Sequence, residues 1–294
     1  MEGYNMEYNK TEEKKYFFTY EEADEEHLEA KDLAQRVLTD PELSKLKSIV
    51  MGNYGEPWED SNGFQCILDS FVEHKEKLSH IESFFIGDMD YEECEISWIE
   101  QGNYEEFIKA FPNMKQLIIQ GSTNLILGNI EHNELRCLKV ICGGLPKSVL
   151  QEVANAKLPN LETLTLYMGV DDYGFDGSID DIKPLVSKQL FPKLQTLGLV
   201  NSDIQDEIIK IILDSDILPQ LKILQLSYGT LSDVGGQYIL DKVEDIKHLT
   251  SLDCEYNYLS DSMLEKLQQL PIEVNISNQQ EDDEEYEKWP MVTE

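Results

Sequence analysis

A spaced pattern of apolar residues recurs along this sequence and leaves few folds open to it. The pattern is Leu-x-x-Leu-x-Leu, with Ile, Met, Val, Phe or Cys as substitutes. Its eight copies begin at Leu46, Ile81, Met114, Leu135, Leu161, Leu194, Leu221 and Leu249, at intervals of 21 to 35 residues. Residues 272–276 would form the edge strand of a ninth copy. One unit of this length cannot bury its own apolar face, so we expect stacked units around one continuous core.

Each copy is expected to hold a strand followed by a helix. Apolar residues after the strand recur at helical spacing, for example Ile204 and Ile208. Ser202 and Gln205 have the spacing of a capping box before that helix, and Ser260 marks another helix start. Proline disfavours helical geometry in the residue before it, so helix ends are predicted at Pro112, Pro159, Pro192 and Pro219. Each unit is therefore predicted to contain a helix, a proline that ends the helix, and a strand.

The period and the apolar pattern are those of leucine-rich repeats. The repeat resembles the ribonuclease-inhibitor class, which implies an α/β solenoid shaped as a horseshoe or arc, with parallel strands on the concave face and helices on the convex face. Three stretches also resemble an uncharacterised bacterial family of leucine-rich-repeat proteins: residues 86–99, 143–146 and 171–174. This second resemblance implies the fold and carries no assigned activity, so it supplies no site residues.

The chain is expected to divide into three parts. Residues 1–40 are predicted to hold a short strand at 16–18 and one amphipathic capping helix over 21–38, because terminal caps keep the ends of solenoids soluble. Residues 41–280 form the repeat solenoid. Residues 281–294 form an acidic tail that begins with five consecutive carboxylates, which favours a solvated segment. Residues 289–292 could fold back onto the last repeat.

Charge excludes some classes of partner. The 294 residues include 58 Asp plus Glu against 24 Lys plus Arg, a formal charge of −34, which repels the phosphates of nucleic acids. The sequence also indicates a cellular location. No apolar run approaches the roughly 18 residues of a membrane span. The first residues are polar, with no apolar stretch typical of a secretion signal, and five cysteines are an odd number, so a cytoplasmic protein with reduced thiols is expected.

The predicted concave face is more balanced than the rest of the chain. Its positions carry five basic and five acidic residues: Lys47, Lys115, Arg136, Lys139 and Lys222 against Glu82, Asp88, Glu162, Asp253 and Glu255. The helices and loops are therefore expected to hold most of the negative charge. Within this face Lys115, Arg136 and Lys139 form a cluster that offers a docking point to an acidic group.

Three insertions follow strands and are expected on one rim, at residues 52–63, 88–102 and 169–181. Insertions in repeat proteins often form the binding face, and Tyr and Trp are enriched among interface hot spots. The candidate partner-binding residues are Trp58, Tyr91, Tyr167, Asp171, Asp172, Tyr173, Phe175, Tyr228, Tyr256, Lys115, Arg136 and Lys139. The alternative is that these aromatic residues only pack their loops onto the solenoid.

Metal and catalytic sites are weakly supported. Asp172, Gly174 and Asp176 imitate the start of an EF-hand calcium loop, but the twelfth place holds Lys183 instead of a bidentate Glu. Cys137 and Cys142 lack the second ligand pair of a structural zinc site. No nucleophile elbow, phosphate loop or dinucleotide fingerprint is present. We therefore expect no enzyme activity, no cofactor and no metal.

The favoured function is a protein-interaction scaffold whose partner has a basic or mixed-charge surface, because opposite fields speed encounter. No nucleic-acid or membrane partner is expected. Two alternatives remain open. One is an inhibitor or immunity-type protein for a basic enzyme, and the other is a calcium-dependent binding module that uses the loop from Asp171 to Asp181.

Overall fold

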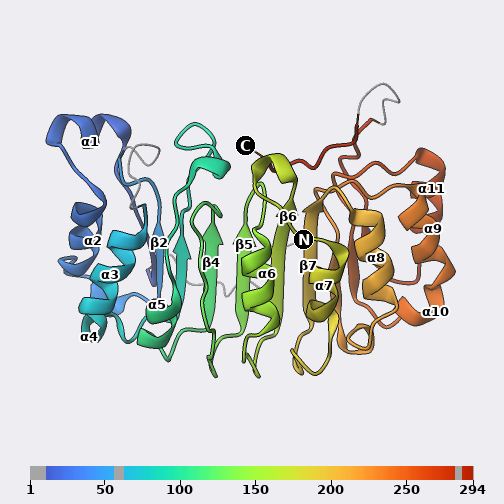
Figure 1. Cartoon of the computed structure of the whole chain (residues 1–294), viewed down its shortest axis with the longest axis horizontal. Coiled ribbons are helices and arrows are strands. Elements are labelled where there is room, and N and C mark those ends of the chain that lie inside the picture. Colours follow the sequence, from blue (N-terminus) through green and yellow to red (C-terminus); the bar gives the residue numbers. More distant parts are fainter. Residues whose placement is uncertain (1–10, 56–62, 282–286, 294) are drawn as a thin grey trace.

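The computed structural model describes residues 11–55, 63–281 and 287–293. Its centre is a ten-stranded sheet in which every pair of neighbours is parallel and the strand order follows the sequence (Figure 1). The strands are β1 (Glu13–Tyr16), β2 (Ser48–Met51), β3 (Ser83–Ile86), β4 (Gln116–Gln120), β5 (Cys137–Ile141), β6 (Thr163–Gly169), β7 (Thr196–Ser202), β8 (Ile223–Gln225), β9 (Ser251–Asp253) and β10 (Glu273–Asn275). A stack of similar units gives this order, and each of strands β2 to β9 lies in one copy of the pattern, so the repeat prediction is confirmed.

The described helices all cover one face of the sheet (Figure 1). The α-helices are α1 (Tyr20–Glu26), α2 (Ala30–Leu38), α3 (Gln65–Glu73), α4 (Lys75–Leu78), α5 (Glu105–Ala110), α6 (Lys147–Ala154), α7 (Ile179–Ile182), α8 (Gln205–Leu213), α9 (Asp233–Asp241), α10 (Val243–Ile246) and α11 (Asp261–Leu267). Short 3-10 helices are η1 (Leu43–Lys45), η2 (Ile96–Trp98), η3 (Asp171–Tyr173), η4 (Lys183–Val186) and η5 (Leu218–Gln220). We call the opposite face of the sheet the strand face. None of the described helices is long and apolar enough to cross a membrane.

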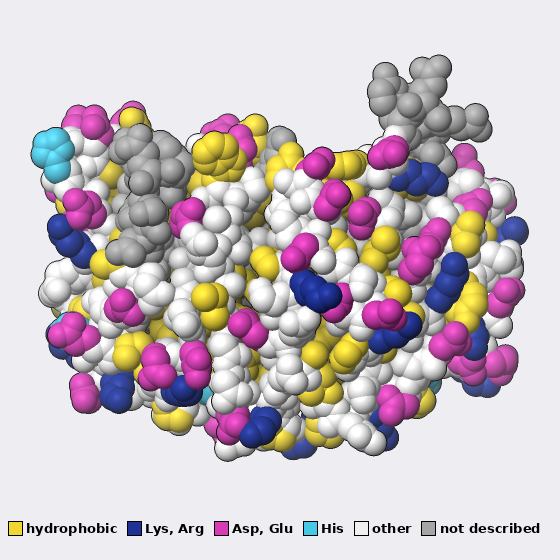
Figure 2. All heavy atoms as spheres, in the orientation of Figure 1, with side chains coloured by type: hydrophobic (Ala, Val, Ile, Leu, Met, Phe, Trp, Pro, Cys, Tyr) yellow, Lys and Arg dark blue, Asp and Glu magenta, His cyan; other side chains and the backbone are white. Residues whose placement is uncertain are grey.

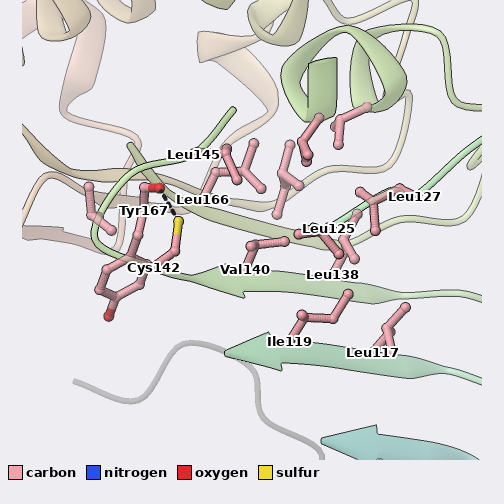
Figure 3. Packing of buried hydrophobic residues seen from close by; sticks show 14 of the residues in the cluster. Leu117, Ile119, Leu125, Leu127, Leu138, Val140, Cys142, Leu145, Leu166 and Tyr167 are labelled. Atoms are coloured by element: carbon pink, nitrogen blue, oxygen red, sulfur yellow. Dashed lines mark hydrogen bonds between the residues drawn. The ribbon is translucent and has the colours of Figure 1, made fainter. Parts of the chain in front are cut away.

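The core lies between the sheet and the helices. Strands β2 to β9 each begin two residues after the first apolar residue of a copy, and the fourth residues of the copies stand in register, as Leu117 beside Leu138. Figure 3 shows Leu117 and Ile119 of β4 on the same side as Leu138 and Val140 of β5. Alternating residues of a strand point to opposite faces, so these leucines form one continuous row. The structure is therefore a leucine-rich-repeat α/β solenoid.

The amino-terminal cap differs from the prediction of a single helix over 21–38. His27 adopts a left-handed conformation with φ 54° and ends α1. Glu29 is the N-cap of α2 and forms a capping box with Asp32. In this box each of the two side chains accepts a hydrogen bond from the backbone N–H of the other residue. The chain therefore turns between two helices, because local capping at both sides of the break outweighs the continuous apolar pattern. The first strand, β1, lies slightly earlier than the predicted 16–18.

Two further helix predictions were wrong. The capping box expected at Ser202 and Gln205 does not form, because Ser202 lies in β7 and Ile204 is the N-cap of α8. The Gln205 side chain is buried and donates a hydrogen bond to the Leu199 carbonyl at 2.8 Å. Segment 121–136 contains no helix. The copy that begins at Met114 has only 21 residues before the next, too few for a strand, two turns and a helix.

Aspartates join neighbouring units at the starts of helices. Asp206 accepts from the backbone N–H groups of Ser232 (2.9 Å) and Gly235 (3.1 Å) and from the Ser232 hydroxyl (2.5 Å). Asp233 repeats the arrangement one unit later and accepts from the backbone and hydroxyl of Ser260, which caps α11 as predicted. These carboxylates satisfy backbone N–H groups at helix starts that have no partner within the helix.

We expect Asp206→Ala to lower the free energy of unfolding by about 1–2 kcal/mol, because loss of a helix-capping acceptor costs about that much. The control is Glu265→Ala, which removes an exposed carboxylate from α11. Urea unfolding followed by circular dichroism measures both variants. Equal stability of the two variants would show that the contact between units contributes nothing.

Candidate functional site

Three tyrosines stack at the carboxyl ends of the strands. The ring centroids of Tyr167 and Tyr228 are 6.0 Å apart with planes inclined by 22°, and those of Tyr228 and Tyr256 are 5.3 Å apart at 16°. Tyr167 lies within β6, whereas Tyr228 and Tyr256 follow β8 and β9, so the stack passes over the last residues of β7. We call these three residues the tyrosine stack. Tyr167 is buried, and the other two rings are partly exposed.

The backbone conformation that orients the outer rings is unusual. Tyr228 and Tyr256 have φ angles of 67° and 52°, and Asn201 has φ 55° at the equivalent position of the preceding copy. Residues other than glycine and asparagine seldom adopt this left-handed region, and such strain persists where the surroundings hold it. The repeat therefore holds bulky aromatic side chains where it would accept glycine more easily.

A cation lies at one end of the tyrosine stack. The Lys139 ammonium in β5 is 5.6 Å from the centroid of the Tyr167 ring, within range of a cation–π interaction. Burial lowers the pKa of Lys139. Burial also raises the pKa of Tyr167 to about 12, and the charges of Asp253 and Glu255 add to that rise. The Tyr167 phenol is therefore neutral at physiological pH.

Two carboxylates lie at the other end. The Tyr228 hydroxyl donates to Glu255 at 3.1 Å, and the Ser277 hydroxyl donates to the second Glu255 oxygen at 3.1 Å. Asp253 is only 4% exposed, and its pKa is raised, chiefly by burial. The surface thus runs from a cation, across three aromatic rings, to a pair of carboxylates. Such a surface can hold an apolar side chain between groups of opposite charge.

The structure separates Lys115 and Arg136 from this surface. Lys115 and Arg136 immediately precede β4 and β5, whereas the tyrosines lie toward the carboxyl ends of the strands or beyond them. Lys115 pairs with Glu82 at 2.6 Å and Arg136 pairs with Glu162 at 3.0 Å. The predicted basic cluster is therefore divided, because carboxylates on neighbouring strands balance two of its three charges. Only its third member, Lys139, adjoins the tyrosine stack.

The insertion after β3 exposes two large aromatic side chains. Tyr91 is 64% exposed and Trp98 is 58% exposed. Met89, Cys94 and Ile96 of the same insertion are buried. The loop is therefore anchored from within while its aromatic residues face outward. Trp58, predicted on the neighbouring insertion, lies outside the described residues.

The Asp-rich insertion forms a compact turn. Asp171 and Asp172 are exposed in η3, Tyr173 is half-buried, and Gly174 ends the turn with φ 107°. Phe175 is only 6% exposed and belongs to the core, so it packs this insertion onto the solenoid, as the alternative interpretation expected.

The carboxylates of this insertion stabilise the turn and the helices around it. Asp176 accepts from the Lys147 backbone N–H at 2.6 Å, at the start of α6. Asp181 pairs with the Lys147 ammonium at 3.1 Å and closes the capping box of α7. Among the described residues no three His, Cys, Asp or Glu side chains gather as metal ligands.

The carboxyl-terminal residues 287–293, which we call the tail segment, run along the upper edge of the sheet in Figure 1. The segment first meets Tyr258, whose hydroxyl donates to the Trp289 carbonyl at 3.0 Å. It continues past Tyr228 and Asn201 and ends beside Gly143, after β5. The sequence placed residues 289–292 on the last repeat, but they extend across the ends of several strands to the middle of the solenoid.

The sequence did not count four exposed or contact-making residues near these strand ends among the binding candidates: Trp98, Asn201, Trp289 and Met291. Trp289 and Met291 are 38% and 45% exposed. A tryptophan and a methionine beyond a block of acidic residues were a usable signal, because apolar residues are unusual in solvated tails. Asn201 gave no local signal, since its role depends on a segment about 90 residues away in sequence.

Acidic side chains are spread over the helix face, with Lys and Arg side chains between them (Figure 2). On the strand face charges also form pairs, here between neighbouring strands. Lys15 lies 3.0 Å from Asp88, and Glu82 accepts from Lys115 and lies 3.7 Å from Lys47. Paired charges therefore occur on both faces of the sheet.

Among solved structures, the following are similar to this chain. One is the crystal structure of a protein from Bacteroides fragilis, with 43% sequence identity, a TM-score of 0.87, and coverage of 92% of this chain and 76% of that chain. An internalin from Listeria monocytogenes has 13% identity and a TM-score of 0.29, covering 86% of this chain and 88% of that one. A leucine-rich-repeat protein from Leptospira interrogans has 12% identity and a TM-score of 0.24, covering 80% and 91%.

No protein-family model matches the sequence, and no curated protein matches it. The TM-scores of the internalin and the Leptospira interrogans protein are too low to relate their whole folds to that of this chain. The identity to the Bacteroides fragilis protein extends over most of both chains and accompanies the same fold. The chain therefore belongs to the same family as this Bacteroides fragilis protein.

Proposed function

We propose that this chain is a non-enzymatic scaffold that binds a protein partner through the tyrosine stack and the strand ends around it. The observation that carries the proposal is the stack itself. Tyrosine buries a large area and loses few rotamers on binding, so preordered rings are effective contact residues. The rings of Tyr228 and Tyr256 are partly exposed, and their left-handed backbone holds them in place before any partner arrives.

The proposed partner has a mixed-charge surface. A basic group would face Glu255, and an acidic group would face Lys139. The formal charge of −34 favours a partner that is basic overall, because opposite fields accelerate association. Tyr91, Asp171, Asp172 and Tyr173 extend the proposed contact along the same rim. We place the interaction in the cytoplasm.

The proposed shape is the horseshoe of the ribonuclease-inhibitor class, since helices alternate with strands along most of the solenoid. In that case the strand face would be concave and would surround part of the partner. A sharper form of the proposal makes the partner a basic enzyme and this chain its inhibitor, a step that rests on fold analogy.

Affinity capture from a lysate of the source organism, with the chain as bait, tests the proposal. The matched variants are Tyr256→Ala, which removes the outer ring, and Tyr256→Phe, which keeps the ring and removes only the hydroxyl. We expect Tyr256→Ala to weaken binding of the captured partner at least tenfold and Tyr256→Phe to leave it nearly unchanged, because the ring supplies the contact area. Isothermal titration with the purified partner gives both affinities.

Thermal unfolding of both variants is the control for folding. Equal affinity of the Ala variant and the original chain would remove the tyrosine stack from the interface. A large fall in melting temperature for Tyr256→Ala would mean that the ring serves packing instead. Capture that depends on calcium would favour the loop from Asp171 to Asp181.

A further inference from the structure

The tail segment is held chiefly by its main chain. The Asn201 side chain accepts from the Val292 backbone N–H at 2.8 Å and donates to the Val292 carbonyl at 2.5 Å. The Met291 backbone N–H donates to the Tyr228 carbonyl at 2.9 Å. Three hydrogen bonds thus bind the backbone of two consecutive residues. Recognition through main-chain hydrogen bonds is typical of sites that receive extended peptides.

Asn201, which makes two of these bonds, is also held by a contact outside the tail segment. Its backbone has φ 55°, and its side-chain amide also donates to the Cys142 carbonyl at 3.4 Å. Its side chain therefore has little freedom to lose when it binds a peptide. Gly143 allows the end of the tail segment to approach, because a Cβ atom there would lie 2.3 Å from the Thr293 carbonyl oxygen. Only glycine fits so close to a second backbone.

The side chains of the tail segment contribute less than its backbone. Val292 is partly buried against the core, while Trp289 and Met291 remain 38% and 45% exposed. Tyr258 holds the Trp289 backbone, accepting from its N–H at 3.1 Å and donating to its carbonyl. A different extended segment with a small apolar residue at the place of Val292 could form the same hydrogen bonds.

We propose that Gly143, Asn201, Tyr228 and Tyr258 form a groove for an extended peptide, and that the tail segment is its intramolecular ligand. Tyr228 belongs to both the groove and the tyrosine stack. The inference therefore deepens the proposed function and rests on it: the protein partner presents an extended segment that displaces the tail segment. That segment carries backbone N–H groups at the places of Met291 and Val292, so proline is excluded from both.

The test uses the full chain with Met291→Pro, which removes the N–H that binds Tyr228, and Met291→Leu, which keeps it. The probe is a fluorescein-labelled peptide with the sequence of residues 287–294, and binding is measured by fluorescence anisotropy. An attached ligand competes at an effective concentration on the order of 1 mM. We expect the probe to bind Met291→Pro at least tenfold more tightly than Met291→Leu or the original chain.

Two controls define the site. A probe with proline at the place of Met291 should bind none of the chains detectably. The second control adds Asn201→Asp to the Met291→Pro chain. This change should abolish binding of the original probe, because a carboxylate cannot donate to the Val292 carbonyl. Circular dichroism verifies folding, and Val292→Pro serves as a second released variant. The groove proposal would be wrong if a folded Met291→Pro chain failed to bind the probe, or if all chains bound it equally.

The groove and the tyrosine stack can fail separately. Tyr256→Ala leaves every hydrogen bond to the tail segment in place, so it should not change probe binding. If the probe does not bind but Tyr256→Ala still loses the captured partner, the groove is wrong and the scaffold proposal stands. If the probe binds and Tyr256→Ala retains the partner, the tyrosine stack is not the contact surface.

Discussion

Replacing Leu197 by alanine should lower the free energy of unfolding by about 2–5 kcal/mol, as deletion of large core side chains does. Leu197 is fully buried in β7, where it stands in register between Leu164 of β6 and Leu224 of β8. Neighbouring strands hold the row of leucines at a fixed spacing, so the sheet cannot collapse into the space left behind. Stability in a repeat array depends on contacts between neighbouring units, and this substitution weakens two of them.

Urea denaturation measures the change, with Val234→Ala as the control. Val234 is 59% exposed on α9, so removing its methyl groups should cost less than about 0.5 kcal/mol, as is usual for surface positions. A loss below about 1 kcal/mol for Leu197→Ala would contradict the continuous core. A change in the slope of the transition would indicate that the units no longer unfold together.

Replacing Asn257 by alanine should cost about 3 kcal/mol, because buried groups that lose their hydrogen-bond partners cost about 1–3 kcal/mol each. Asn257 is fully buried after β9. Its carbonyl oxygen accepts from the Leu231 backbone N–H at 2.9 Å, and its amide donates to the Leu226 carbonyl at 2.9 Å. One side chain therefore ties two neighbouring units together at their strand ends.

Asn257→Asp distinguishes the two hydrogen bonds, because the aspartate keeps the acceptor for the Leu231 N–H and removes the donor to the Leu226 carbonyl. We expect it to lose stability as well, since a buried carboxylate would face backbone carbonyls. Asn155→Ala, at an exposed helix end, is the matched control. If Asn257→Ala unfolds at the same urea concentration as that control, water or another group satisfies the backbone.

The strand pattern could be predicted because it depends on local geometry. Side chains alternate along a strand, so the spacing of Leu221, Leu224 and Leu226 specifies which residues face the helices without knowledge of any distant contact. The same reasoning located the edge strand β10 and the Ser260 cap of α11. It failed at Ser202, because the capping pattern was correct in spacing but the residue was already part of β7.

The candidate site could be predicted only in part. The sequence named Tyr167, Tyr228 and Tyr256 among the candidate binding residues. It did not predict that their rings stack across the end of β7, which depends on the left-handed backbone at Tyr228 and Tyr256. It also grouped Lys115 and Arg136 with Lys139, whereas carboxylates on adjacent strands balance the first two charges.

The sequence by itself determined the repeat, the order of the strands and the residues of the core, because each follows from spacing within a short stretch of chain. Only the tertiary structure decided how the surface is used. The pairing of charges, the tyrosine stack and the path of the tail segment all join residues from different units. The contact of Asn201 with Val292 shows the reason: neither residue has a local signal, and their hydrogen bonds exist only because the solenoid brings them together.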